Sequence, residues 1–574
     1  MPFTPTPEQS AIFSVLTFNP SQHLIIDAKA GAGKSSTLIE AIKQRCLKGT
    51  ILGLAFNRAI ADEMKAKLSD LPFDLRVQTN FSTVHSHGLA AFRKAGHKPQ
   101  TQGGKLHFLL KDAQAQLRPD DPARRNARHI ARLVSYAKSA GFGLTSAAEH
   151  FPSIVNKDAW HLLIAHFNLD EELEAGYTAD DLVEDAIDLL LLSNKKIAMI
   201  DFDDMIYLPL LLNLPIPTYD NVLIDEAQDI NATRRELAFR SLKPNGRLVA
   251  VGDPNQAIYG FTGASTKSLD EIGDRAVGSV TLPLSICWRC DDRILDEARK
   301  IVPTIQTAPS KVGKGSVRRM PFRFEGDARS GAEAQDFLAH PRPGDAILCR
   351  LNKPNVAVVL GLLRRGTPAK IEGRDLGKKL LDHVKKACQR YAFDPLPEVA
   401  EDLERYKENE VARLCAKDRE TAAALLEDEV DAAILLIERV LETNPKGGFT
   451  ALEALVATLF GDDVKSNACV TLSSIHKAKG REWKRVFILG RDDYMPFRRA
   501  TAPWEIEQEY NLIYVACTRA QSELVYVTGV RQAIDEGLHR LPALATRSGA
   551  IVPAPAEPDI EQAAVLSAYE QDGR

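Results

Sequence analysis

The sequence has no long apolar run and no cysteine framework. No stretch of roughly 18 consecutive apolar residues occurs, so we expect no membrane-spanning helix. The first ten residues, MPFTPTPEQS, have neither a basic start nor an apolar core, so we expect no signal peptide. The 8 cysteines are scattered, and the C-x-x-C pair of Cys287 and Cys290 has no second pair at zinc-finger spacing. This pattern favours a reducing intracellular compartment and argues against both a disulfide scaffold and a zinc site.

An excess of one charge is also lacking. Lys and Arg total 73 and Asp and Glu total 77, which gives a net charge of −4. A small DNA-binding domain would be basic, but a large enzyme can confine its basic groups to one groove. The balance therefore neither supports nor excludes a nucleic-acid partner. The length of 574 residues suggests roughly three or four domain-sized units, and no internal repeat is visible.

A glycine-rich loop near the N-terminus joins two predicted elements. Residues 23–27, HLIID, predict a buried strand, and residues 35–48 predict a helix. The loop AKAGAGKSS between them resembles a phosphate-binding loop, although Ala28 stands where the general pattern has glycine. Lys34 would reach the β- and γ-phosphates, and Ser35 would bind Mg²⁺. On this segment alone, an ordinary strand–helix turn remains the alternative.

Two further apolar runs end in polar side chains. VLIDEAQD predicts a strand that delivers Asp225 and Glu226, and residues 246–253, GRLVAVGD, predict another strand just before Gln256. Asp225 would hold Mg²⁺, directly or through water, and Glu226 would position the attacking water. Gln256 lies where a γ-phosphate sensor is expected. A solvated acidic turn would explain the carboxylates, but not their place at a strand end in a chain with a phosphate loop.

Together with several other segments, these motifs resemble those of the UvrD/Rep-like superfamily 1 DNA helicases. The matching segments follow the family order from residue 9 to residue 520: TPEQSAIF, AKAGAGKSS, LAFNRAIADEM, FSTVHSHGLAAF, IDFDDMIYLPL, VLIDEAQD, PNQAIYGF, LSICWRC, ILCRLN, TLSSIHKAKGREWKRVFIL and EQEYNLIYVACTRA. LAFNRAIADEM is most similar to the F-box DNA helicase subgroup and its phage and bacterial relatives. We recognise no F-box segment ahead of the motor motifs.

The resemblance implies an α/β fold with two RecA-like P-loop motor domains, each a parallel sheet flanked by helices and each with a mainly helical insertion. The order of the motifs places motor domain 1A at residues 1–90 and 200–280, insertion 1B at 91–199, motor domain 2A at 281–375 and 465–548, a small charged insertion 2B at 376–464, and a flexible tail at 549–574.

The two insertions differ in charge. Insertion 1B carries a basic cluster of Arg124, Arg125, Arg128, Arg132 and Lys138. Three of these arginines have helical spacing, and their face would meet duplex phosphates or simply be solvated. Insertion 2B is rich in acidic residues, which suits a regulatory or protein contact better than DNA.

By resemblance, side chains of both motor domains surround ATP and Mg²⁺. The residues assigned to catalysis are Lys34, Asp225, Glu226, Gln256, Arg289 and Arg519, the two arginines acting as fingers from 2A. The nucleotide-binding residues are Gln9, Ala28, Gly31, Gly33, Lys34, Ser35, Ser36, Trp288 and Glu482, with Ser35 and Asp225 as the Mg²⁺ ligands. Gln9 would hold the adenine edge, Trp288 would stack on adenine, and Glu482 would contact the ribose. The alternative for Trp288 is a core aromatic. Ser36 stands where the family often has arginine, which weakens the expected packing on adenine.

The resemblance also implies a DNA-binding surface of stacking rings and polar groups. Its candidate residues are Phe56, Thr83, His85, Tyr259, Phe261, Arg350, Asn352 and His476. Bases stacked on aromatic rings contribute about 1–3 kcal/mol each. For Phe56, burial at a strand end is an open alternative. Thr262 replaces an arginine that is usual in the family, which puts in doubt a charged link beside Tyr259 and Phe261.

The predicted function is that of an ATP-dependent DNA helicase and translocase on single-stranded DNA, moving 3′ to 5′ by resemblance, in DNA repair or recombination. The alternatives are a translocase that strips proteins such as recombinases and unwinds weakly, a scaffold with a silent ATPase, and an RNA substrate. Expected partners are single-stranded DNA, its junctions with duplex, and a protein bound through 2B or the tail, without a membrane. We expect a cytoplasmic monomer, associated with the nucleoid in a bacterial or phage setting and nuclear in a eukaryote.

Overall fold

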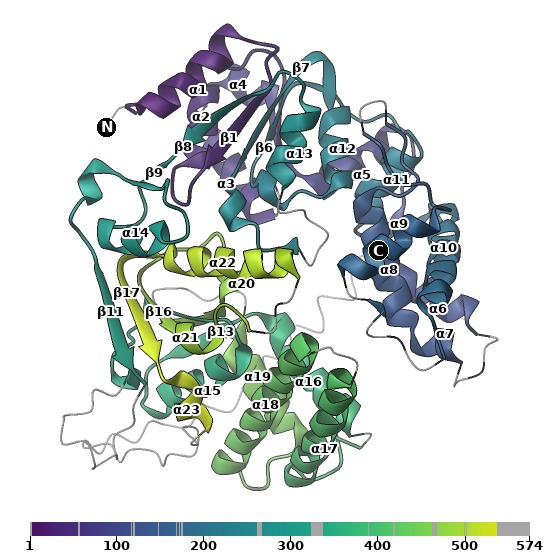
Figure 1. Cartoon of the computed structure of the whole chain (residues 1–574), viewed down its shortest axis with the longest axis vertical. Coiled ribbons are helices and arrows are strands. Elements are labelled where there is room, and N and C mark those ends of the chain that lie inside the picture. The colour runs from purple at the N-terminus through teal and green to yellow at the C-terminus, as the bar shows by residue number, and fades with distance from the viewer. Residues whose placement is uncertain are drawn as a thin grey trace, which may run out of the picture.

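A computed structural model of the chain shows two parallel sheets, each flanked by helices, with a group of helices beside each (Figure 1). The structure describes residues 3–55, 58–69, 71–115, 118, 121–146, 149–167, 169–170, 173, 176–260, 267–322, 337–388, 390–416, 420–461, 468–498, 500 and 502–535. The predictions for Phe56, Phe261, Thr262 and the tail at 549–574 lie outside these residues. In the described part of the chain, no helix combines the length and the apolar character needed to cross a bilayer.

The first sheet belongs to motor domain 1A and has the order β3-β2-β6-β7-β1-β8. Its strands are β1 Leu24–Ala28, β2 Ile51–Ala55, β3 Thr79–Thr83, β6 Tyr219–Ile224, β7 Leu242–Gly252 and β8 Val280–Leu284. All neighbouring strands pair in parallel, which suits their continuous apolar runs because both faces are covered. Strand β8 extends this sheet slightly past residue 280, where the sequence placed the domain boundary.

The carboxyl ends of β1, β6 and β7 meet at one edge of this sheet. β7 lies between β6 and β1, and Ile26 on β1 is in register with Val251 on β7. This edge is where ligands bind in open α/β sheets. The loops after these three strands carry the phosphate loop, the Asp225–Glu226 pair and Gln256, so one edge gathers the groups that the sequence analysis assigned to ATP.

Helices cover the first sheet and follow its strands in sequence. They are α1 Pro7–Phe18, α2 Lys34–Lys43, α3 Arg58–Leu68, α4 Phe73–Gln78, α5 Val84–Lys94, α11 Asp204–Leu211, α12 Ala232–Arg240 and α13 Ser268–Arg275, with short 3₁₀ turns η2 Ala227–Asp229 and η3 Pro254–Gln256. The prediction of a helix over residues 35–48 was too long. Helix α2 ends at Lys43, because Arg45 takes a left-handed backbone with φ of 58°.

Insertion 1B consists of helices α6 Lys105–Ala113, α7 Pro122–Arg125, α8 Ala127–Ala140, α9 Lys157–His166 and α10 Ala179–Lys195, with the small pair β4 Gln100–Thr101 and β5 Met199–Ile200. Its apolar side chains share one core cluster with part of 1A.

The structure corrects two predictions for the basic cluster of 1B, the shared helix face of Arg125, Arg128 and Arg132 and the exposure of Lys138. Arg125 ends α7, whereas Arg128 and Arg132 lie on α8, so the three arginines do not share one helix. Lys138 is fully buried and pairs at 2.7 Å with both Asp201 and Asp204. A buried ammonium requires such carboxylate partners, so Lys138 stabilises the join between 1B and 1A and contributes nothing to a surface for phosphates.

The second sheet belongs to motor domain 2A and is also parallel, with the order β11-β17-β16-β12-β15-β13-β14. Its strands are β11 Ser316–Pro321, β12 Ala346–Cys349, β13 Ala369–Glu372, β14 Phe460–Gly461, β15 Val470–Ser474, β16 Trp483–Leu489 and β17 Ala520–Thr528. The other elements are β9 Ile286–Cys287, β10 Gln306–Thr307, α14 Asp292–Arg299, η5 Pro309–Lys311, η6 Phe337–Ala339, α15 Asn352–Arg364, α20 Ile475–Ala478, α21 Arg491–Tyr494, α22 Pro503–Cys517 and α23 Val530–Asp535.

Insertion 2B consists of α16 Arg374–Ala387, α17 Leu396–Cys415, α18 Glu420–Thr443 and α19 Phe449–Leu459. These helices lie together below the second sheet in Figure 1 and share a core cluster with it. The sheet resumes at β14, slightly before residue 465. Helix α22 lies between the two motor domains in Figure 1, next to the phosphate-loop edge.

Candidate nucleotide site and DNA-facing edge

The phosphate loop joins β1 to α2 and packs directly against domain 2A. Gly31 and Gly33 have φ of 67° and 82°, a left-handed conformation that favours glycine. A Cβ atom on Gly31 would lie 2.7 Å from Cβ of Arg289 and 2.9 Å from Sγ of Cys287. Ala28 is the fully buried last residue of β1, so the position that departs from the general pattern accepts a small side chain.

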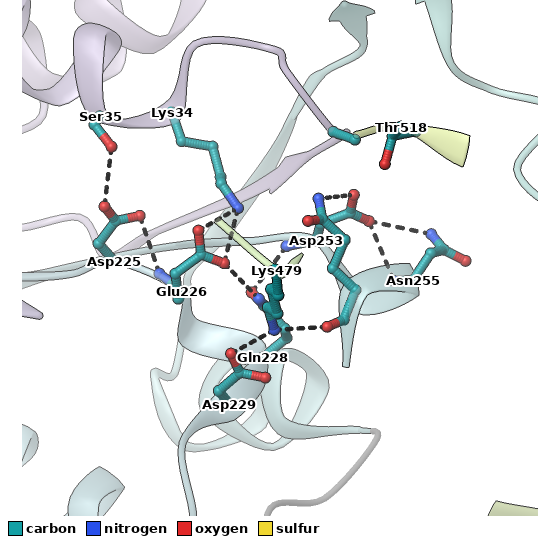
Figure 2. A network of polar contacts seen from close by, with 12 residues as sticks. Lys34, Ser35, Asp225, Glu226, Gln228, Asp229, Asp253, Asn255, Lys479 and Thr518 are labelled. Atoms are coloured by element: carbon teal, nitrogen blue, oxygen red, sulfur yellow. Dashed lines mark hydrogen bonds and ion pairs between the residues drawn. The ribbon is translucent and has the colours of Figure 1, made fainter. Parts of the chain in front are cut away.

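The loop lysine and serine meet the two carboxylates at the end of β6 (Figure 2). Lys34 Nζ lies 2.9 and 3.0 Å from the two carboxylate oxygens of Glu226. Ser35 Oγ donates to Asp225 Oδ2 at 3.1 Å. These two oxygens are the kind of ligand that Mg²⁺ prefers, so the predicted magnesium ligands fit this ion and lie side by side.

The two carboxyl groups differ in pKa. Burial and the neighbouring charge of Glu226 raise the pKa of Asp225 to about 6. Burial also opposes ionisation of Glu226, but the charges of Lys34 and Lys479 outweigh it and hold the pKa of Glu226 at about 2. Glu226 has φ of 54°, which is strained for a residue with a side chain. The carboxylate proposed to position water is therefore ionised and rigidly held.

Gln256 follows β7 in a 3₁₀ turn and connects the two domains. Its amide Nε2 donates to Asp253 Oδ2 at 2.7 Å. Its Oε1 accepts from Arg519 Nη2 at 3.3 Å, and its backbone oxygen accepts from Lys479 Nζ at 2.7 Å. Lys479 also pairs with Asp229 at 2.6 Å (Figure 2). Arg519 is buried, which lowers its pKa to about 10 and leaves it charged at neutral pH.

The second predicted arginine finger is held by the predicted ribose contact. Arg289 Nε donates to Glu482 Oε2 at 2.5 Å, and its Nη1 donates to the backbone oxygen of Thr518 at 3.3 Å. Glu482 also accepts from Gln521 at 2.9 Å. Arg289 is thus held by the Glu482 side chain and the Thr518 backbone of its own domain.

The adenine-side residues lie around the same loop. Gln9 is buried, and its Nε2 donates to Thr37 Oγ1 on α2 at 2.9 Å, while its Oε1 caps α1. Trp288 donates its backbone N–H to Gly31 at 2.9 Å and has 47% of its surface exposed. The alternative of a core aromatic is therefore wrong for Trp288. Ser36 lies in the first turn of α2 and is exposed.

Asp229, Asp253, Lys479 and Tyr514 of this network were not predicted individually, although all four lie within motifs or strands named from the sequence. Asp253 ends a predicted strand, and its position there would have indicated it. Tyr514 reaches the site from α22: its hydroxyl accepts from the Ala30 backbone N–H at 2.9 Å and lies 3.1 Å from Asp253 Oδ2. The direction in which Tyr514 points depends on how α22 packs, and the sequence does not show that.

The DNA-binding candidates of 1A gather where β3 leads into α5. Thr83 caps α5 by accepting from the Ser86 N–H at 3.2 Å. His85 lies in the first helical turn, and burial followed by the charge of Arg234 lowers its pKa to about 4. The exposed ring of Phe202 lies edge-on to His85 with 6.4 Å between centroids. Phe202 was quoted within IDFDDMIYLPL but was not singled out.

The candidates of 2A lie at the carboxyl ends of β12 and β15. Arg350 follows β12, donates to Glu509 at 2.9 Å and lies 5.1 Å over the ring of Phe497. Asn352 begins α15, and its N–H donates to Asp428 of 2B at 2.7 Å. His476 lies on α20 just after β15.

Tyr259 connects the candidate nucleotide site with the candidate DNA-binding residues. We call the latter, which are Thr83, His85, Arg350, Asn352 and His476, the DNA-facing edge. Its hydroxyl donates to the backbone oxygen of His476 at 3.2 Å. Lys479 Nζ lies 4.8 Å from the Tyr259 ring centroid, within the range of a cation–π contact. The same ammonium also binds Asp229 and the Gln256 backbone, so one lysine of 2A contacts both the sensor segment and a predicted stacking ring.

Two family models match the chain. The UvrD/REP helicase N-terminal domain matches residues 7–276, and the UvrD-like helicase C-terminal domain matches residues 470–527. The chain belongs to the UvrD-like helicases. The two matched ranges hold most of the candidate nucleotide-site residues of this UvrD-like helicase, whereas Trp288 and Arg289 lie between the two ranges.

Relatives that match 87 to 91% of this chain agree with this assignment. The helicase is 23% identical to the ATP-dependent DNA helicase UvrD2 of Mycobacterium tuberculosis, over 88% of this chain and 76% of the relative. It is 25% identical to the ATP-dependent DNA helicase UvrD1 of the same organism, over 87% and 79%. It is 24% identical to F-box DNA helicase protein 1 of Schizosaccharomyces pombe, over 91% of this chain but 57% of that protein. The predicted resemblance to the UvrD-like family is thus confirmed.

Proposed function

We propose that the chain is an ATP-driven translocase that moves 3′ to 5′ on single-stranded DNA and separates duplex ahead of it. The family itself implies ATP-dependent DNA helicase activity. The coupling of ATP hydrolysis to DNA movement is supported by the contacts of Lys479. Lys479 binds the Asp229 carboxylate and the Gln256 backbone and also lies over the Tyr259 ring. A change at the γ-phosphate sensor would therefore move a predicted base-stacking ring.

Residues of 1A would hold and orient the nucleotide. Lys34 and the loop N–H groups would bind the phosphates, and Ser35 with Asp225 would hold Mg²⁺, which when bound neutralises phosphate charge. Glu226, ionised at neutral pH, would accept a hydrogen bond from the attacking water and orient it in line. Gln256 would bind beside the γ-phosphate.

Residues of 2A would complete the site on closure. Arg519 contacts Gln256, and Arg289 packs on Gly31. An arginine finger stabilises charge in the transition state and contributes on the order of 10³-fold or more in rate. Because both arginines come from the second domain, hydrolysis would require a closed cleft, and its products would favour opening.

The DNA would lie across the carboxyl edges of both sheets. Thr83, His85 and Phe202 of 1A would contact one part of the strand, and Arg350 and His476 of 2A would contact the next. If the residues of 1A and those of 2A bound the strand alternately as the cleft closed and opened, the protein would move along the DNA. The partner would be single-stranded DNA and its junction with duplex, bound by a monomer, and a protein would bind through 2B.

The decisive experiment compares two site variants on three substrates. Lys34→Ala and Glu226→Gln should each lower DNA-stimulated ATPase to the background, while thermal unfolding stays unchanged. Lys43→Ala, an exposed position at the end of the same helix, is the matched control and should keep full activity. Surviving ATPase in either site variant would refute the site assignment.

The same preparations test polarity and substrate. Unwinding is measured on 3′-tailed, 5′-tailed and RNA-tailed duplexes, with displacement of a recombinase filament in parallel. We expect unwinding of the 3′-tailed DNA alone. Filament displacement without unwinding would identify a protein-stripping translocase, and activity on the 5′-tailed substrate would reverse the proposed polarity.

A further inference from the structure

A tyrosine hydroxyl bridges the two motor domains at the phosphate end of the cleft. Tyr514 lies on α22 of 2A and is fully buried. Its oxygen accepts from the Ala30 N–H of the phosphate loop at 2.9 Å and lies 3.1 Å from Oδ2 of Asp253. Both partners belong to 1A, so this single oxygen contacts the loop and the sensor segment from across the domain boundary.

The direction of each hydrogen bond follows from the chemistry. A phenol hydroxyl has one proton to donate. Since the oxygen already accepts from Ala30, its proton points to Asp253. Burial raises the pKa of Tyr514 well above its ordinary value, so the group keeps this proton at neutral pH. Asp253 Oδ2 also accepts from Gln256, whose own oxygen accepts from Arg519. The result is a continuous chain of hydrogen bonds from the loop to the arginine finger.

Neighbouring groups of 2A hold the same segment. Asn511, almost one turn before Tyr514 on α22, donates to the backbone oxygen of Ala257 at 3.1 Å. Lys479 donates to the backbone oxygen of Gln256 at 2.7 Å. All of these bonds cross from 2A to 1A, so separation of the domains must break them together. Tyr514 alone in this group also touches the phosphate loop among the described contacts.

We propose that Tyr514 is a positioning residue, which sets the Gln256 side chain and the Ala30 amide for hydrolysis when the cleft is closed. It acts through Asp253 and the loop backbone. This inference rests on the proposed ATPase site and adds to it a residue of 2A beside the two arginines. Loss of the hydroxyl should therefore slow the chemical step more than it weakens ATP binding, because Lys34 and Ser35 are untouched.

The test is Tyr514→Phe, which removes the hydroxyl and keeps the ring. Hydrogen bonds to charged groups contribute about 1.5–3 kcal/mol, so DNA-stimulated kcat should fall by about tenfold to hundredfold. KM for ATP should change less than about threefold and the thermal unfolding midpoint should not move, a split that a purely structural role would not give. The matched control is Tyr526→Phe, another buried 2A tyrosine, whose hydroxyl contacts Cys517 and Glu297 instead.

A second variant tests the route through Asp253. Asp253→Asn keeps the size of the side chain and should lower kcat to a similar degree. In the double variant Tyr514→Phe with Asp253→Asn the losses should not multiply, because both act on one chain of contacts. If Tyr514→Phe unfolds the protein, wild-type kcat in Asp253→Asn overturns the proposal by itself.

The failure of this inference is distinguishable from failure of the proposed function. A kcat within twofold of wild type in Tyr514→Phe, beside an inactive Lys34→Ala, overturns the role of Tyr514 and leaves the ATPase site standing. Multiplying losses in the double variant also overturn it. Full ATPase in Lys34→Ala would instead remove the site on which the inference rests.

Discussion

The nucleotide cleft and the DNA-facing edge hold their residues in different ways. In the cleft, side-chain contacts of 2.6 to 3.3 Å link Lys34 and Gln228 to Glu226, and link Gln256 to Asp253 and, across the domain boundary, to Arg519. At the DNA-facing edge, His85 and Arg350 are half-buried and contact mostly their own domain. A network that crosses domains should fail as a unit, whereas separate contacts should fail one at a time. Substitutions in the cleft should therefore abolish ATPase activity. Substitutions at the DNA-facing edge should each lower DNA binding by a limited amount.

The largest expected effect is that of Arg519→Ala. Arg519 is buried, and its guanidinium contacts the Gln256 side chain. We expect kcat to fall on the order of 10³-fold, with single-stranded DNA affinity unchanged, as measured by steady-state ATPase and by fluorescence anisotropy. Arg318→Ala, an exposed arginine of the same domain, is the control. A loss of DNA affinity equal to the loss of kcat would contradict the separation of cleft and edge.

Tyr259 should give an intermediate effect, because it belongs to the edge but touches the cleft lysine. Tyr259→Ala removes the ring, and DNA affinity should fall by about 1–3 kcal/mol, roughly fivefold to 150-fold. Tyr259→Phe removes only the hydroxyl that donates to His476 and should retain most of the affinity. Anisotropy titrations with a labelled oligonucleotide measure both. Equal losses in the two variants would show that the hydrogen bond, and not the stacking, matters.

The difference between the two regions also explains what the sequence could predict. Lys34, Asp225 and Gln256 follow parallel strands, and the carboxyl ends of such strands share an edge, so their meeting follows from local pattern alone. The roles of Arg289 and Arg519 were predicted from the order of motifs in a known family. The strand runs likewise predicted most of both sheets.

The features that the sequence did not predict depend on contacts between distant segments of the chain. Lys138 belongs to the basic cluster of the sequence, but its partners Asp201 and Asp204 lie about sixty residues later, and nothing local indicates that pairing. Tyr514 has the pattern of a core residue, and it is buried; only the packing of α22 turns its hydroxyl toward Ala30. Helix α2 ends early because Arg45 has a left-handed backbone conformation, whereas helix propensity alone would favour a longer helix.

A smaller effect is expected from the contact between α22 and insertion 1B. The Trp504 ring stacks on His166 with 5.4 Å between centroids, and a Cβ atom on Gly260 would lie 3.1 Å from it. Aromatic pairs contribute about 0.5–1.5 kcal/mol. Trp504→Ala should therefore reduce strand separation per ATP by roughly threefold to tenfold while ATPase is retained. An equal loss of ATPase and unwinding would show that Trp504 acts through the nucleotide site instead.

The smallest expected effect is that of pH on DNA affinity. Burial lowers the pKa of His476 to about 3 and that of His85 to about 4. Both rings are therefore neutral in the free protein above pH 6 and gain no charge as pH falls from 8 to 6. If they contact DNA as neutral hydrogen-bonding groups, the affinity for a labelled oligonucleotide should change less than twofold over this range at fixed salt. A steep rise in DNA affinity toward pH 6 that disappears in His476→Asn would show that the His476 ring takes up a proton when DNA phosphates bind. The DNA-facing edge would then depend on charge, as the cleft does.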